Sequence, residues 1–213
     1  MSMIGNFRAL SPRLLEALRQ NPANIHAVLG IPTEFSDNEE PAIPQELLEA
    51  GFSDGDVCEI LDIQKAWHGV YFLLCGRATP EGDTPRSQAI MGGREVGEDL
   101  GYGPARFLEP QEVKETAAVL GSISADDLSA NFDPETMNAA MIYPGGWDCN
   151  DRENLQWLLD ACVEVRDYYN LAAEKGFAMI LHVIYLIGTW DQDSFIPWTQ
   201  SSKSECISSF GAL

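Results

Sequence analysis

Basic residues are scarce in this chain. It carries 13 Lys and Arg against 33 Asp and Glu among 213 residues, for a formal net charge of −20. A field of this sign repels phosphate backbones, and no cluster of Lys and Arg is present to displace counterions from them. The composition therefore argues against direct nucleic-acid binding. It suits either a basic protein partner, which the field would steer toward the surface, or an acidity that only maintains solubility.

Long hydrophobic runs are also missing. The most apolar stretch, Phe177–Ile187, is far shorter than the ~20 residues that span a bilayer. Residues 1–10 lack a basic start followed by an apolar run, so no signal peptide is expected. The five cysteines are dispersed without a Cys-x-x-Cys pair, which argues against a disulfide framework and a structural zinc site. These absences predict a cytoplasmic protein with reduced thiols and no membrane segment.

The familiar catalytic and cofactor motifs are absent too. The chain has no Gly-x-Ser-x-Gly elbow, no phosphate-binding loop ending in Gly-Lys-Ser/Thr, and no dinucleotide fingerprint. Its three histidines, His26, His68 and His182, lack the spacing typical of metal ligands. We therefore predict no metal and no cofactor. His182 lies among apolar residues and is expected to be a hydrogen-bonded core histidine.

What the chain does contain is an alternation of strand and helix patterns. Met3–Ala9 and Phe177–Ile187 read as strands, and we expect them to share a sheet because a strand needs neighbours to satisfy its backbone groups. Ser11-Pro12 is an N-cap followed by a proline at the first helical position, which predicts a short helix over Arg13–Arg19. Asp151–Lys175 has the apolar spacing of the longest helix and ends at Gly176.

These elements predict the fold class α+β. We expect a single compact domain over residues 1–187, with a mixed or antiparallel sheet packed with helices. Residues 188–213 are expected to form a C-terminal extension. Within the domain, a helix over Ile63–Cys75 is predicted from one apolar stripe, and a short extended piece is expected over Ser87–Val96.

A candidate binding cleft comes from two neighbouring patterns. Trp67 and His68 open the predicted helix, where a Trp-His pair can stack on a ligand and exchange a proton with it. The second pattern is a Gly-rich loop over Gly97–Arg106, which we expect to lie close to His68, with Arg106 paired to a carboxylate. The candidate residues are Trp67, His68, Glu98, Asp99, Tyr102 and Arg106. The alternative is a core tryptophan, a hydrogen-bonded boundary histidine and a structural loop held by an Asp–Arg pair.

An acidic run is the second candidate feature. No Lys or Arg occurs between Arg19 and Lys65, while acidic residues accumulate there. If this run is a docking surface, the carboxylates expected to steer a basic partner include Glu39, Glu40, Glu46 and Glu49. The alternative is an ordinary solvated face.

Several of these stretches, taken in order, resemble the YfbM-like family of bacterial proteins, a domain of unknown function. They are Met-Ile-Gly-Asn-Phe (Met3–Phe7), Leu-Asp-Ile-Gln-Lys-Ala-Trp-His-Gly (Leu61–Gly69), Val-Gly-Glu-Asp-Leu-Gly-Tyr-Gly-Pro-Ala-Arg (Val96–Arg106), Tyr143-Pro144 with Trp147, and the last helix and strand through Gly176–His182. The resemblance covers most of the chain up to Ile187 and implies a compact α+β domain. It implies no reaction, since the family has no settled activity.

Two functional hypotheses follow. The favoured one is a non-catalytic binding or interaction protein, for example one that neutralises a basic partner, because the charge is strongly negative and no catalytic signature is present. The alternative is a small-molecule-binding enzyme, such as a hydrolase. In that case His68 or Glu98 would be the general base, and Arg106 would bind an anionic group.

Overall fold

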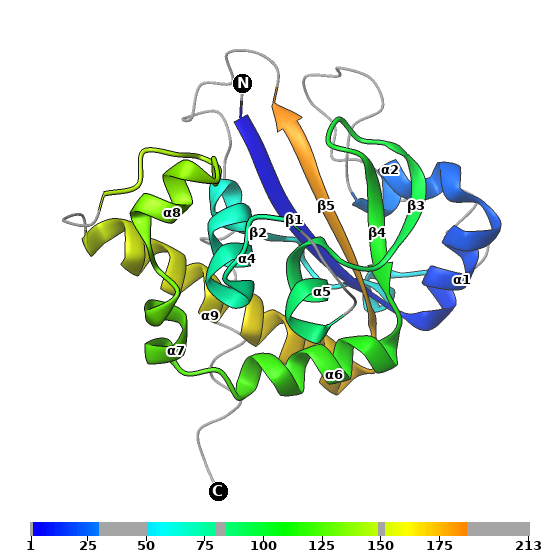
Figure 1. The fold of residues 1–213 in the computed structure, drawn as a ribbon. Helices are drawn as coiled ribbons and strands as arrows, with labels where there is room; N and C mark the ends of the chain where they lie inside the picture. The colour runs from blue at the N-terminus through cyan, green and yellow to red at the C-terminus, as the bar shows by residue number, and fades with distance from the viewer. Residues whose placement is uncertain (1, 30–50, 80–83, 149–151, 187–213) are drawn as a thin grey trace, which may run out of the picture.

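A five-stranded antiparallel sheet with helices on both faces forms the frame of the protein (Figure 1). The structure is a computed structural model, and it describes residues 2–29, 51–79, 84–148 and 152–186. The strands are β1 (Ser2–Leu10), β2 (Leu61–Asp62), β3 (Arg94–Asp99), β4 (Pro104–Leu108) and β5 (Ala178–Leu186). Their order across the sheet is β2-β1-β5-β4-β3, and each neighbouring pair is antiparallel. The predicted α+β class is confirmed.

The two central strands are the two that the sequence predicted to share a sheet. β1 and β5 pair over their whole lengths, from Ser2 opposite Leu186 to Leu10 opposite Ala178. Because side chains alternate along a strand, β1 sends Phe7 and Ala9 to one face and Leu10 to the other. Both faces are covered, so both central strands contribute to two cores.

The two faces of the sheet are covered by unequal numbers of helices. They are α1 (Pro12–Gln20), α2 (Ile25–Leu29), α4 (Trp67–Cys75), α5 (Pro85–Met91), α6 (Pro110–Gly121), α7 (Ala125–Ala130), α8 (Pro134–Ala139) and α9 (Arg152–Lys175). The larger core lies between the sheet and α4, α5, α6 and α9, with α7 and α8 at its margin. The smaller core lies between the opposite face and α1 and α2.

Caps and stops fix the ends of the helices, including the predicted start of α1 and the predicted end of α9. The Ser11 side chain accepts a hydrogen bond from the backbone N–H of Leu14, and Pro12 is the first residue of α1. At α7, Ser124 and Asp127 form a reciprocal capping box. α9 ends at Gly176, whose φ of 66° lies in the left-handed region that glycine adopts without strain.

Two predictions of local structure were wrong. The first half of the segment expected to be extended, Ser87–Val96, belongs to α5, which begins at a Thr84 capping box, and the extended backbone begins only at Arg94 in β3. The expected loop over Gly97–Arg106 is largely a β-hairpin, with a turn only between Asp99 and Pro104. A bulge at Gly97 and Glu98 interrupts the strand alternation there, which hid the hairpin.

Two predicted segments cannot be compared with the structure. The C-terminal extension, residues 188–213, lies outside the described residues. So do Glu39, Glu40, Glu46 and Glu49 of the acidic run.

Candidate functional site

Trp67 and His68 stand at the beginning of α4, directly after a single turn of 3₁₀ helix. Trp67 is buried against β1 at Gly5. A β-carbon at Gly5 would lie 2.5 Å from the β-carbon of Trp67, so only glycine lets the helix approach the strand this closely. The Met-Ile-Gly-Asn-Phe stretch is thereby tied to the Trp-His pair.

These two rings belong to an aromatic cluster, which we define as Trp67, His68, Tyr102, Tyr143 and Tyr185. The His68 ring stacks on Trp67 with centroids 4.9 Å apart and planes 9° apart. Tyr102, from the β3–β4 turn, lies 5.3 Å from Trp67 and 5.9 Å from Tyr185, and Tyr143 lies 6.1 Å from Trp67. Offset and tilted ring pairs at such distances stabilise a fold beyond their buried area. Tyr102 is 43% exposed and forms the cluster's contact with solvent.

Both ring nitrogens of His68 are occupied by the backbone. Nε2 lies 2.9 Å from the carbonyl oxygen of Ala78, and Nδ1 lies 3.1 Å from the backbone nitrogen of Tyr143. A carbonyl can only accept and a backbone N–H can only donate, so the neutral ring with its proton on Nε2 satisfies both. Burial lowers the pKa of His68, with the bond to Ala78 acting in the opposite direction. His68 is therefore a neutral crosslink between two segments that follow α4.

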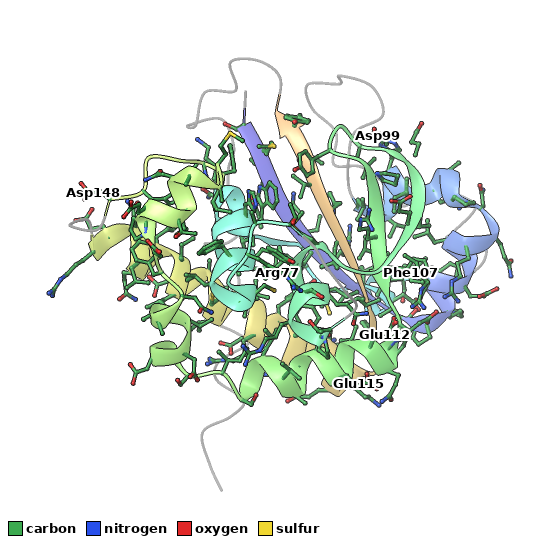
Figure 2. The ribbon with its side chains drawn as sticks, in the orientation of Figure 1. Arg77, Asp99, Phe107, Glu112, Glu115 and Asp148 are labelled. Atoms are coloured by element: carbon green, nitrogen blue, oxygen red, sulfur yellow. The ribbon has the colours of Figure 1, made fainter. Side chains whose placement is uncertain are left out.

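The charged candidates have partners within the hairpin or on α2. Arg106 pairs with Glu95 on the neighbouring strand at 2.7 Å. Asp99 accepts hydrogen bonds from the backbone N–H groups of Gly101 and Gly103, at 2.7 and 2.9 Å, and so shapes the turn at the hairpin tip (Figure 2). Glu98 lies 2.9 Å from the Nε2 atom of His26 on α2.

The structure thus brings together Trp67, His68 and Tyr102, while the polar groups of Glu98, Asp99 and Arg106 bind other partners. Arg106 does pair with a carboxylate, as predicted, and that carboxylate is Glu95. Sequence reasoning missed Tyr143 and Tyr185 as members of the cluster. For Tyr185 a signal existed, because it shares the alternating face of Met179, Leu181 and Val183 on the predicted strand.

His182 lies on the opposite face of the sheet and is buried, as the sequence indicated. It stands opposite Asn6 in the β1–β5 pairing. Desolvation lowers its pKa to about 4, and the nearby Arg8 acts in the same direction. Its Nδ1 atom has no hydrogen-bond partner, which differs from the expected fully bonded core histidine.

A second region bears on function because of its charge. The sequence has no Lys or Arg between Lys114 and Arg152, a run that contains α7 and α8. Carboxylates on α7 and α9 form what we call the acidic rim: Asp126, Asp127, Asp160, Glu164 and Asp167. All five are exposed, and the three on α9 are spaced i, i+4 and i+7, which places them on one helix face.

The rim is weakly neutralised. Salt bridges within the described residues reach it at one place, where Arg166 pairs with the neighbouring Asp167 at 2.9 Å. Asp127 also feels the charge of Arg86, but its depressed pKa is due first to hydrogen bonds from Ser124. The excess charge of the rim therefore faces solvent. The basic-poor stretch after Lys114 was a sequence signal for the α7 carboxylates Asp126 and Asp127, whereas the three carboxylates on α9 lie beyond it.

Two other features are absent from the described residues. Residues 2–29, 51–79, 84–148 and 152–186 contain no group of three or more His, Cys, Asp and Glu side chains placed to hold a metal ion. No helix in these ranges has both the length and the apolar character to span a membrane.

A protein of known structure has a similar fold. The chain is similar to the crystal structure of YfbM from Escherichia coli, a protein of unknown function, with a TM-score of 0.62 and 22% sequence identity. The similarity covers 85% of this chain and 99% of YfbM, and at this identity it shows the shared fold. No curated protein matches the chain. The profile of the family described as Domain of unknown function (DUF1877) matches residues 1–182, so the predicted YfbM-like resemblance is confirmed and the chain belongs to this family.

Proposed function

We propose that this protein is a binding module whose acidic rim receives a basic protein partner. One observation carries the proposal: a set of exposed carboxylates on α7 and α9 lies in a chain of net charge −20 and pairs with few cations of its own fold. Single-sign surfaces of this kind raise association rates with oppositely charged partners and reject like-charged ones.

The bonds around His68 favour binding over the alternative of catalysis. A general base must offer a free lone pair to the substrate, and both nitrogens of His68 are bonded to backbone groups. Glu98, the other candidate base, pairs with His26. Arg106, the candidate anion binder, pairs with Glu95. The aromatic cluster is thus explained as a structural crosslink.

The test compares two triple variants that change the net charge equally. In the first, the rim is neutralised by Asp126→Asn, Asp160→Asn and Glu164→Gln. In the matched control, three exposed carboxylates elsewhere are replaced by Glu16→Gln, Glu59→Gln and Glu98→Gln. The probe is a synthetic lysine-rich helical peptide with a single stripe of leucines, and its association rate is measured at several salt concentrations.

We expect the rim variant to associate at least about tenfold more slowly than the control at low salt, with the difference shrinking as salt is added. Equal rates for the two variants would mean that only the overall field of the protein acts. Unchanged rates in both would leave the carboxylates with no role in binding. Either outcome would refute the proposal.

A further inference from the structure

An apolar groove runs along the acidic rim. It lies between α9 and the segment joining α6 to α7, is partly open to solvent, and has a volume of about 80 Å³. Its lining is Leu74, Leu120, Ile123, Ala125, Leu128, Leu159, Cys162, Val163 and Arg166. All of these side chains except Arg166 are apolar or weakly polar, so the groove offers a hydrophobic floor.

The groove is open at Val163, which is 44% exposed although it lies mid-helix on α9. Beneath it Cys162 is nearly buried, and burial raises the pKa of its thiol to about 12, so the floor carries no thiolate charge. A partly exposed β-branched residue above an uncharged floor is a site where an incoming apolar side chain can be desolvated.

The rim borders this groove on two sides. On α9, Leu159, Val163 and Arg166 face the groove, and the carboxylates of Asp160, Glu164 and Asp167 follow the adjacent stripe of the same helix. On the other side, Asp126 and Asp127 lie in the first turn of α7, next to the lining residue Ala125. An apolar channel flanked by carboxylates has the complementary pattern to a helix with an apolar stripe between basic residues.

We propose that this groove binds a basic amphipathic helix, with the apolar stripe on the groove floor and the flanking Lys and Arg on the acidic rim. The proposal rests on the function proposed above and specifies its partner. Charge decides against two other occupants. A second copy of this chain would bring another −20 charges to the rim, and residues 188–213 contain one Lys against three acidic residues.

The experiment separates the groove from the charge by using two peptides. Both are lysine-rich helices of equal length and charge; one has leucines at positions i, i+4 and i+7, and the other has alanines there. Dissociation constants are measured by fluorescence anisotropy with the full chain. We expect the leucine peptide to bind at least about tenfold more tightly, since burying even one leucine is sufficient for that ratio.

The deciding variant is Val163→Glu, which adds a negative charge while placing a carboxylate at the mouth of the groove. We expect leucine-peptide affinity to fall to the alanine-peptide level, although charge alone would increase it. Val163→Gln provides a neutral second variant with the same expected direction. Circular dichroism and the thermal midpoint, Tm, establish that both variants fold.

Equal binding of the two peptides, or tighter binding to Val163→Glu, would overturn the proposal that the groove binds the helix. The proposed role of the acidic rim would be unaffected by this result. Binding of neither peptide, or binding that is insensitive to rim neutralisation, would refute the proposed function itself. A dimer in sedimentation that Val163→Glu converts to monomers, with peptide binding unchanged, would assign the groove to self-association and also overturn the proposal.

Discussion

The aromatic cluster and the acidic rim use polar groups in opposite ways. In the cluster, His68 bonds at both ring nitrogens, and the Tyr143 hydroxyl accepts a hydrogen bond from the backbone N–H of Met3. In the rim, Asp126 and Glu164 stand on exposed helix positions, surrounded by other carboxylates. In the first region, the hydrogen bonds of His68 and Tyr143 join β1, α4 and the segment before α9. The second leaves its charge available to other molecules.

This difference shows that the conspicuous residues of this sequence serve the fold. Trp, His and Gly attract attention because they are chemically distinctive, yet here Gly5, Trp67 and His68 solve a packing problem. Asp and Glu on helices are common and attract little notice. What distinguishes these carboxylates is the scarcity of cations near them. This scarcity can be recognised only when the positions of several helices are known.

The comparison would be tested most severely by Trp67→Ala. Trp67 is 1% exposed and contacts three other rings and β1, so its truncation leaves a large cavity. We expect the free energy of unfolding to fall by about 3–5 kcal/mol. Val163→Ala is the matched truncation in the groove and should cost within about 0.5 kcal/mol, because that side chain is 44% exposed.

Urea unfolding followed by far-UV circular dichroism measures both variants, since the signal does not depend on the removed tryptophan. Similar losses for the two substitutions would contradict the contrast between a structural and an available region.

A medium effect is expected from His68→Phe. Phenylalanine retains the ring stacking but leaves the carbonyl of Ala78 and the N–H of Tyr143 without their partner. We expect a loss of about 1–3 kcal/mol in the free energy of unfolding. His68→Asn, which can restore one of the bonds, should lose less.

The same variant should also alter how the free energy of unfolding depends on pH. The folded state lowers the pKa of His68, so the unfolded chain binds more protons there. The stability tied to the neutral ring is present above the ordinary pKa of 6.5 and is lost as the pH falls below it. The free energy of unfolding of the His68→Phe variant should therefore fall less steeply on acidification than that of the parent protein. The part of the slope that is due to His182 should be retained. An identical slope would mean that the pKa of His68 is the same in the folded and the unfolded chain.

The smallest effect is expected in the rim. Asp160 and Glu164 are like charges at i and i+4 on α9, and their joint replacement by Asn and Gln should raise the free energy of unfolding by about 0.2–0.5 kcal/mol. Asp99→Asn is the contrasting substitution, because Asp99 accepts two backbone N–H groups, and it should destabilise the hairpin. A rim substitution that destabilises the protein would show that these carboxylates serve the fold.

The sequence predicted well wherever the deciding interactions are local. The Ser11 cap, the stop at Gly176 and the alternation along β1 and β5 each depend on a few neighbouring residues, and each is present. Prediction was poorer at Ser87–Val96, where the capping box at Thr84 was overlooked, and in the hairpin, where a bulge at Gly97 breaks the alternation.

The site was harder to predict, because it depends on approach between distant segments. Trp67 meets Tyr102 and Tyr143 only after the sheet has brought the hairpin and the segment before α9 to the same end of α4. Likewise the groove has walls from α7 and α9, which are separated in the sequence by α8. No spacing rule connects such positions.

The pairing of β1 with β5 has a consequence for synthesis on the ribosome. Residues 2–10 are translated long before their partner strand, residues 178–186, which emerges only after nearly all of the domain has been made. Until then the apolar faces of β1 have no neighbour on that side, and the closing contact has a high sequence separation, which slows folding. We therefore expect the nascent chain to depend on chaperones over most of its synthesis, and its two central strands to join in a late, post-exit step.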